Sequence, residues 1–490
     1  NINGLAAKFQ MEESQYPLVK NTDENISKIL PKIIVHKVLF ENTSLSYEDH
    51  NTNETLFADI HQFELKKSLI DLEDEILELD KFSLVKSNIQ LSIGNSIQAI
   101  DSSQNNVHKP SQNNWKVSVK SVALDDNTLA FQQGNEKRNA KAFNTKQQYY
   151  EHLTLLGDDL EYSSEKLCFS IKEFTAVDQN QFAITQFETD FLMLRQSIAL
   201  KKLKVSTTHS SIIGELDLKY ASLESLLDSL PFLMVNINLE NLNLYHQDLL
   251  YFSPELAKQP FFENKSAITT FSGFVSGPVN HLSGKNLLLT TGNNTKITTD
   301  FTIKGLTDIS TAHFYFPNLI ITSGKKDLAV MLGASLPENL DLPEELSLKI
   351  DFNGTINDFK SGILMDGSFG AAHLFVKLNK DEKYLVKLSL KDFNLGRFIN
   401  DTARLGPVSL ALETKGQGLA MENISASIKG EVSSIYFNKY NYHQLSVDGD
   451  INSRKFQGEF SMNDKNAVIN FDGLVDFTPA HEQFNFNLDV

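Results

Sequence analysis

Cysteine and tryptophan are nearly absent, because the 490 residues include one of each, Cys168 and Trp115. A single cysteine excludes an internal disulfide framework, but it does not distinguish a reducing compartment from an oxidising one. Free cysteine usually behaves as a small apolar residue, and Leu167 and Phe169 flank this one. We therefore expect Cys168 to be buried.

Long apolar runs are absent as well. No run approaches the ~20 residues that a membrane-spanning helix needs, and the N-terminus lacks the basic and apolar regions of a signal peptide. We therefore expect this stretch of chain to be soluble. It begins at Asn1 without Met and ends on the strand-like FNFNLDV, which predicts a piece of a longer protein whose anchor or export signal lies outside it.

Positive charge and motifs for chemistry are also scarce. The sequence has 45 Lys and Arg and 62 Asp and Glu, which gives a net charge of -17. No stretch concentrates enough Lys and Arg to bind along a phosphate backbone, so we do not expect a nucleic acid as a partner. No two of the 12 histidines stand two or four residues apart, and HExxH, EF-hand and GxSxG motifs are missing. We predict no catalytic residue, no metal and no cofactor, and therefore not an enzyme.

Two glycine motifs are too incomplete to change that prediction. The Ser-Gly-Lys triplets at 283–285 and 323–325 lack the rest of a phosphate-binding loop. Gly416 and Gly418 begin a dinucleotide fingerprint, but Met421 stands where its third glycine belongs. These segments are interpreted as turns.

What the sequence does contain is alternation. Apolar residues occupy every second position in many runs, which is the period of a strand with one apolar and one polar face. Each run stops at Gly or at an Asn/Asp cluster, as strands do at tight turns. The predicted fold is mainly all-β, an elongated, curled antiparallel sheet that forms an open apolar groove from repeated β-meander units, with a few short amphipathic helices.

The pattern predicts four segments. Residues 1–93 form an N-terminal β-meander, in which the acidic stretch 71–80 is interpreted as strand rather than helix because alternation flanks it. Residues 94–115 are a polar mobile loop. Residues 116–270 and 271–490 are β-groove repeats, and a basic cluster within 132–146 is interpreted as a solvated loop rather than a membrane contact.

Short helices interrupt the repeats. Three segments share one pattern, in which an N-cap type residue comes first and apolar residues then fall on one helix face. They are SLESLL (222–227), DLAVML (327–332) and NLGRFI (394–399). A looser copy, DLLYFSPEL, spans 248–256. We predict helices near 222–230, 246–257, 327–332 and 394–399 that brace the groove edge, with capping or gating as alternatives.

The apolar face must be covered by another sheet, by helices or by curling on itself. A filled β core is one alternative. Few helices, uniform strands and small residues such as Gly449, Gly458 and Gly473 favour a curled, open trough that holds acyl chains. The predicted lining residues are those on the apolar parity of the strands, and a register shift of one residue would turn them to the other face: Ile297, Phe301, Ile303, Leu346, Leu348, Ile350, Phe352, Val386, Leu388, Leu390, Phe456, Phe460, Ile469, Phe471 and Val475.

A family resemblance extends this interpretation from about Ile33 to the end and is densest from Leu223 to Asp450. The chain resembles the TamB branch of the AsmA-like proteins, in the form found in Bacteroidota. Seven segments, in this order, carry the resemblance: SLESLL, LNLYHQDLLYFSPEL, FSGFVSGPVNHLSGKNLLLTTGNNTKITTDFTIKGLTDI, TSGKKDLAVMLGASLPENLDLPEEL, FNGTINDF, LKDFNLGRFI and KGEVSSIYFNKYNYHQLSVDGDI.

The resemblance implies membership of the repeating β-groove, bridge-like lipid-transfer superfamily. Such proteins are tied to the inner membrane by an N-terminal helix, span the periplasm and meet an Omp85-type outer-membrane assembly factor. The sequence lacks both the membrane helix and the partner-binding domain of the family. The leading hypothesis is a periplasmic segment that guides phospholipid between the two membranes and supports outer-membrane biogenesis.

Two other functions remain open from the sequence. The first is a chaperone or scaffold for outer-membrane protein insertion that acts with the assembly factor through exposed strand edges. The second is a closed adhesin or glycan-binding β-solenoid, which predicts aromatic residues on the polar face. Most Phe residues follow the apolar parity instead, although Tyr436, Tyr440 and Tyr442 do not.

Overall fold

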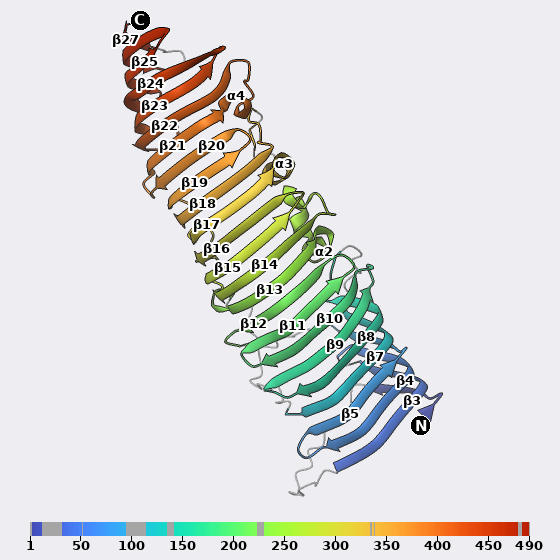
Figure 1. The fold of residues 1–490 in the computed structure, drawn as a ribbon. Helices are drawn as coiled ribbons and strands as arrows, with labels where there is room; N and C mark the ends of the chain where they lie inside the picture. The colour runs from blue at the N-terminus through green and yellow to red at the C-terminus, as the bar shows by residue number, and fades with distance from the viewer. Residues whose placement is uncertain are drawn as a thin grey trace. The chain divides into compact units, whose positions relative to one another are not determined.

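The computed structural model describes residues 2–11, 32–50, 52–94, 114–134, 142–222, 230–333, 336–337, 339–478 and 483–489. These residues are mainly in strands, with a few short helices, which confirms the predicted fold class (Figure 1). The chain divides into two compact units. Unit 1 comprises Asn1–Asp228 with Asn236–Ala257, and unit 2 comprises Ser229–Val235 with Lys258–Val490.

Unit 1 consists of long strands and one helix near its end. Its elements are β1 (Ile2–Asn3), β2 (Ala6–Met11), β3 (Lys32–Asp49), β4 (Glu54–Asp71), β5 (Ile76–Val85), β6 (Asn88–Ile93), β7 (Lys116–Gln133), β8 (Gln147–Tyr162), β9 (Lys166–Asp178), β10 (Ala183–Leu194), β11 (Ser197–Thr207), β12 (Ser211–Lys219), most of β13 (Met234–Tyr245), α2 (His246–Phe252) and most of η2 (Pro254–Lys258).

The antiparallel pattern of unit 1 has exceptions that the sequence did not predict. Strands β1 and β2 pair with β3 in parallel, and β5 and β6 pair with β7 in parallel. A parallel pair needs a crossover connection of a dozen or more residues. The segments 12–31 and 94–115 supply that length before β3 and β7, which explains why the meander is broken at these points.

The acidic stretch 71–80 is not a helix, in line with the sequence interpretation, but only 76–80 is part of β5, and 72–75 form a turn that was not predicted. Strand β4 ends at Asp71 and β5 begins at Ile76. The buried Asp71 carboxylate accepts hydrogen bonds from the backbone N–H of Glu73 (3.1 Å) and of Asp74 (3.2 Å), and its partner Lys32 lies 2.6 Å away. The acid therefore fixes the reversal and does not begin a helix.

Unit 2 is an unbroken antiparallel meander over its described residues, since each strand from β14 to β27 pairs with the next. Its elements are η1 (Leu230–Phe232), η3 (Pro260–Phe262), β14 (Ile268–Pro278), β15 (His281–Thr291), β16 (Thr295–Lys304), β17 (His313–Gly324), α3 (Lys325–Leu332), β18 (Glu345–Thr355), β19 (Asp358–Gly367), β20 (Gly370–Leu378), β21 (Lys383–Asn394), α4 (Leu395–Phe398), β22 (Leu405–Gln417), β23 (Ser425–Phe437), β24 (Tyr440–Asn452), β25 (Lys455–Asp464), β26 (Ala467–Asp476) and β27 (Gln483–Asp489).

Helices occur at three of the four places named from the sequence, as α2, α3 and α4, while 223–229 lies outside the described residues. Helices α3 and α4 follow β17 and β21, which run in the same direction, so they lie along one edge of unit 2 (Figure 1). Asn394 caps α4 as expected, because its Oδ1 accepts the Arg397 N–H at 3.0 Å. Helix α3 begins at Lys325, so Asp327 lies inside it and is not the predicted N-cap.

Bulges bend the strands in both units. The register shifts at residues with positive φ that are not glycine, such as Asp126 (φ 51) and Lys202 (φ 51) in unit 1 and Asn286 (φ 53) and Asp392 (φ 48) in unit 2. An extra residue on one strand of a pair increases the local twist. These bulges are a physical cause of curling that alternation alone could not reveal. The polar segments 95–113 and 135–141, for which loops were predicted, lie outside the described residues.

Candidate functional site: the apolar face

The structure places all fifteen predicted lining residues on one face of the unit 2 sheet. Residues that pair directly across two strands project to the same side, so a chain of pairs traces a row. One row runs from β16 to β26 through Ile297, Ile321, Leu348, Met365, Ala372, Leu390, Leu410, Val432, Leu445, Met462 and Ile469.

Neighbouring rows hold the remaining predicted residues. A second row runs through Leu319, Ile350, Ile363, Leu374, Leu388, Leu412, Gly430, Val447, Phe460 and Phe471. The others belong to further rows on the same parity. Phe352 and Val386 lie in one row, and Ile303, Phe456 and Val475 lie in another. Phe301 pairs with Gly284, and Leu346 pairs with Ser323. We call this surface the apolar face of unit 2.

The apolar face is not sealed by the described residues. Each of the fifteen predicted residues is half-buried, and none is fully enclosed. On the opposite parity, residues such as Lys349, Lys377 and Lys387 are exposed. The sheet therefore presents one polar side and one apolar side that is covered only in part.

The clearest hollow on this face lies near β23 to β26. It has a volume of about 520 Å³ and is lined by apolar side chains, namely Ile428, Val447, Phe456, Phe460, Ile469, Phe471 and Val475. Five of these residues were predicted from the sequence. Ile428 and Val447 were missed, although both continue the same alternation in β23 and β24.

Three glycines form a crease beside this hollow. Gly449 pairs with Gly458, and Gly458 pairs with Gly473, so three strands meet without side chains on the apolar face. The Phe456 ring fills part of the space, since a Cβ on Gly449 would lie 2.7 Å from its Cε2. The sequence interpretation of these glycines as places where a curling strand needs room agrees with this geometry.

Two clusters show where the protein's own side chains do fill the space. In unit 2, Phe369, Phe393 and Val408 are buried, and the Phe398 ring of α4 packs 6.2 Å from Phe369 and 5.7 Å from Phe393. In unit 1, the cluster is Leu79, Val119 and Val122. Helix α4 thus makes the contacts of a brace at one edge, where Met365, Leu390, Leu410 and Val432 of the first row also pack against this cluster.

The polar side is stabilised by charge pairs. Glu413 lies 2.6 Å from Lys415 and 2.9 Å from Lys387, and these two ammonium groups lower the pKa of Glu413 to about 2. Lys429 on β23 lies 3.4 Å from Asp448 on the neighbouring strand β24. Such exposed pairs keep this side hydrated and contribute little energy individually.

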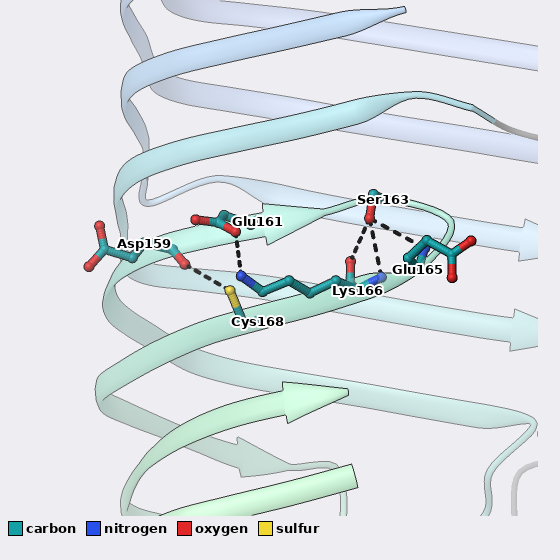
Figure 2. A network of polar contacts seen from close by, with 6 residues as sticks. All are labelled: Asp159, Glu161, Ser163, Glu165, Lys166 and Cys168. Atoms are coloured by element: carbon teal, nitrogen blue, oxygen red, sulfur yellow. Dashed lines mark hydrogen bonds and ion pairs between the residues drawn. The ribbon is translucent and has the colours of Figure 1, made fainter. Parts of the chain in front are cut away.

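Cys168 is not buried, contrary to the sequence interpretation. It is half-buried, and its Sγ lies 3.7 Å from the Asp159 carbonyl oxygen, beside the Glu161 and Lys166 ion pair (Figure 2). Leu167 and Phe169 flank it on β9 and therefore face the opposite, apolar side. The strand period, applied to these neighbours, places the thiol on the polar side.

The described residues contain no group of three His, Cys, Asp or Glu that could hold a metal ion, and none of their helices is long and apolar enough to cross a membrane. Comparison of the chain with protein-family models, with curated proteins and with solved structures gives no match.

Proposed function

We propose that the chain is a periplasmic segment of a TamB-type, AsmA-like envelope protein. Its apolar face guides phospholipid acyl chains between the inner and the outer membrane, in support of outer-membrane biogenesis. The observation that carries this proposal is the half-burial of the fifteen aligned apolar residues. A continuous, partly exposed apolar surface bordered by polar residues is a typical mark of an interaction site.

The energetics favour an acyl chain as the occupant. Each methylene kept from water is worth about 0.8 kcal/mol, so a 16-carbon tail crossing water alone faces a cost of roughly 12 kcal/mol. Rows of Ile, Leu, Val and Phe that continue from strand to strand remove most of that cost at each position along the sheet. The polar side meanwhile keeps the protein hydrated.

Ile350 and Lys349 offer a matched test on adjacent residues of β18. Ile350 is half-buried on the apolar face, whereas Lys349 is exposed on the polar side. We expect Ile350→Asp to reduce co-purifying phospholipid, counted per protein by native mass spectrometry, by tenfold or more, which corresponds to about 1.4 kcal/mol. Lys349→Asp introduces the same carboxylate on the other side and should leave the lipid content unchanged.

Folding is checked by circular dichroism, because Ile350 is only half-buried and a carboxylate introduced at its position can still reach water without unfolding the sheet. Phe301→Asp repeats the test on β16. Equal lipid in Ile350→Asp, Lys349→Asp and the unsubstituted protein would contradict the proposal. A protein without lipid that still binds unfolded outer-membrane polypeptides would instead favour a chaperone acting with an Omp85-type factor.

A further inference from the structure

A second hollow, in unit 1, has a different lining. Its volume is about 1240 Å³, and it is lined by the turn between β8 and β9 (162–166), the turn between β10 and β11 (194–197) and the end of β12 with residues 220–222. Two hydrogen bonds join the last two of these segments. The Tyr220 N–H donates to the Gln196 carbonyl oxygen (3.0 Å), and the Tyr220 hydroxyl donates to the Leu194 carbonyl oxygen (3.2 Å).

One wall of the hollow is apolar. Tyr162, Leu167 and Met193 line it, and they belong to a row that continues along unit 1 on the same parity. Direct pairs connect that row through Leu77, Val117, Tyr162, Leu167, Met193, Ile198 and Leu218. The hollow therefore adjoins this apolar row at the ends of the strands.

The other wall carries positive charge. Lys166, Arg195 and Lys219 line the hollow with one carboxylate, that of Glu165, so the lining has a charge of +2 in a chain whose net charge is -17. Strands β9 and β12 lie three strand spacings apart, roughly 14 Å, and Arg195 stands in the turn between the two middle strands. Lys166, Arg195 and Lys219 thus line one hollow from three separate positions along the strand ends.

The ion pairs that these cations form leave N–H donors available for a ligand. Lys166 lies 2.6 Å from Glu161, and the Arg195 Nη2 atom contacts Glu165. A guanidinium has five N–H donors, so the Glu165 contact does not exhaust Arg195. Within the described part of the chain, no carboxylate lies within ion-pair distance of Lys219.

We propose that this hollow binds the phosphate of a phospholipid headgroup, with the acyl chains on the adjoining apolar row. The inference rests on the proposed function and adds to it a selectivity for phosphate-bearing lipids at a defined place. Arginine matches phosphate with two parallel hydrogen bonds, and lysine adds a mobile point charge. Tyr162, Leu167 and Met193 provide the apolar surface that a free phosphate ion would not use.

The test compares four soluble probes on the full chain by native mass spectrometry and calorimetry, three of them with the same acyl chains: dioctanoyl phosphatidylglycerol, dioctanoyl phosphatidylcholine, dioctanoylglycerol and inorganic phosphate. We expect both phospholipids to bind, with phosphatidylglycerol about tenfold tighter than dioctanoylglycerol, a difference of about 1.4 kcal/mol. Arg195→Gln combined with Lys219→Gln should remove that tenfold advantage and leave dioctanoylglycerol binding unchanged. Arg195→Lys should retain part of it.

Lys202→Gln is the matched control, because Lys202 lies on β11 outside the hollow and pairs with Asp190 at 2.9 Å. Lys219→Gln alone keeps the test valid if loss of the Arg195 partner disturbs the fold. Equal binding of phosphatidylglycerol and dioctanoylglycerol would overturn this inference and leave the acyl-chain proposal intact. Inorganic phosphate that binds as tightly as the phospholipid would overturn it too, whereas failure of every lipid would overturn the proposed function.

Discussion

The Asp327 carboxylate connects helix α3 to a turn of the unit 2 sheet. Although Asp327 lies on α3, its side chain reaches the turn between β15 and β16 and is buried there. It accepts hydrogen bonds from the N–H of Asn294 (2.9 Å), from the N–H (3.1 Å) and hydroxyl (2.9 Å) of Thr295, and from the N–H (3.0 Å) and side-chain amide (2.9 Å) of Asn293.

Asp327→Asn should open this turn. Burial by itself would raise the pKa of Asp327, but the backbone donors of Asn294 and Asn293 and the Thr295 hydroxyl outweigh it and hold the pKa below its ordinary value. An asparagine keeps one acceptor oxygen and turns an NH₂ group toward N–H donors. Hydrogen bonds to charged groups contribute about 1.5–3 kcal/mol each, so the loss of two costs at least ~3 kcal/mol.

Hydrogen exchange measured by mass spectrometry on peptides that contain residues 293–295 provides the assay. A loss of about 3 kcal/mol accelerates exchange through local opening about a hundredfold. Asp366→Asn, at an exposed residue of β19, is the control and should exchange as the unsubstituted protein does. Exchange of Asp327→Asn within about threefold of the unsubstituted protein would refute the reasoning, since a hundredfold effect corresponds to about 3 kcal/mol.

The sign of the pH dependence gives a second check on the same variant. Because the pKa of Asp327 is lowered by folding, its stabilising effect is complete above the ordinary value of 3.8 and is lost as pH falls through the lowered pKa. The difference between the Asn variant and the unsubstituted protein should therefore shrink toward low pH. A constant difference would point to a packing defect instead of a lost charge.

Two further predictions concern the strands of unit 2. Lys415 and Lys387 lower the pKa of Glu413 to about 2, so the stabilising effect of this carboxylate should be complete above pH 4.5 and fade between pH 4.5 and about 2. A carboxyl-carbon NMR titration measures this pKa directly. A midpoint near 4.5 would contradict the prediction. Gly458→Val should destabilise the sheet by about 1–3 kcal/mol in thermal unfolding, because its Cβ overlaps the backbone of Asp448 and Gly449. Gly430→Ala is the comparison, since its Cβ would meet the flexible ends of Leu412 at 3.0 Å and Val447 at 3.1 Å, and equal losses in both variants would exclude the crease as the cause.

The strand period allowed the faces of unit 2 to be predicted from sequence. All fifteen residues chosen by alternation share one face, because bulges such as those at Asn286 and Asp392 leave the pairs on either side in phase with the apolar rows. The cap of α4 was also local, as Asn394 and Arg397 are three residues apart. Features of this kind depend on spacing within one element.

Features that depend on distant contacts could not be predicted. Asp327 accepts hydrogen bonds from residues more than thirty positions away. No local pattern indicates these contacts, and the residue type and position of Asp327 suggested an N-cap instead. The parallel pairing of β5 with β7 depends on a long connection whose path no local pattern specifies. The cations of the unit 1 hollow come from two strand ends and a turn, and only the folded sheet places Lys166, Arg195 and Lys219 around one hollow.

The half-buried state of the apolar face is itself an argument for an occupant. Fully burying a Val, Leu, Ile or Phe side chain stabilises a fold by about 1.5–3 kcal/mol, and a half-buried one gains only part of that. The chain buries side chains fully where α4 covers Phe369 and Phe393, which shows that its helices can complete a core. Beside that cluster, the hollow around Phe460 and Phe471 has no such cover among the described residues. A ligand with methylene groups would recover the missing stabilisation, so lipid should raise the unfolding temperature of the unsubstituted protein more than that of Ile350→Asp.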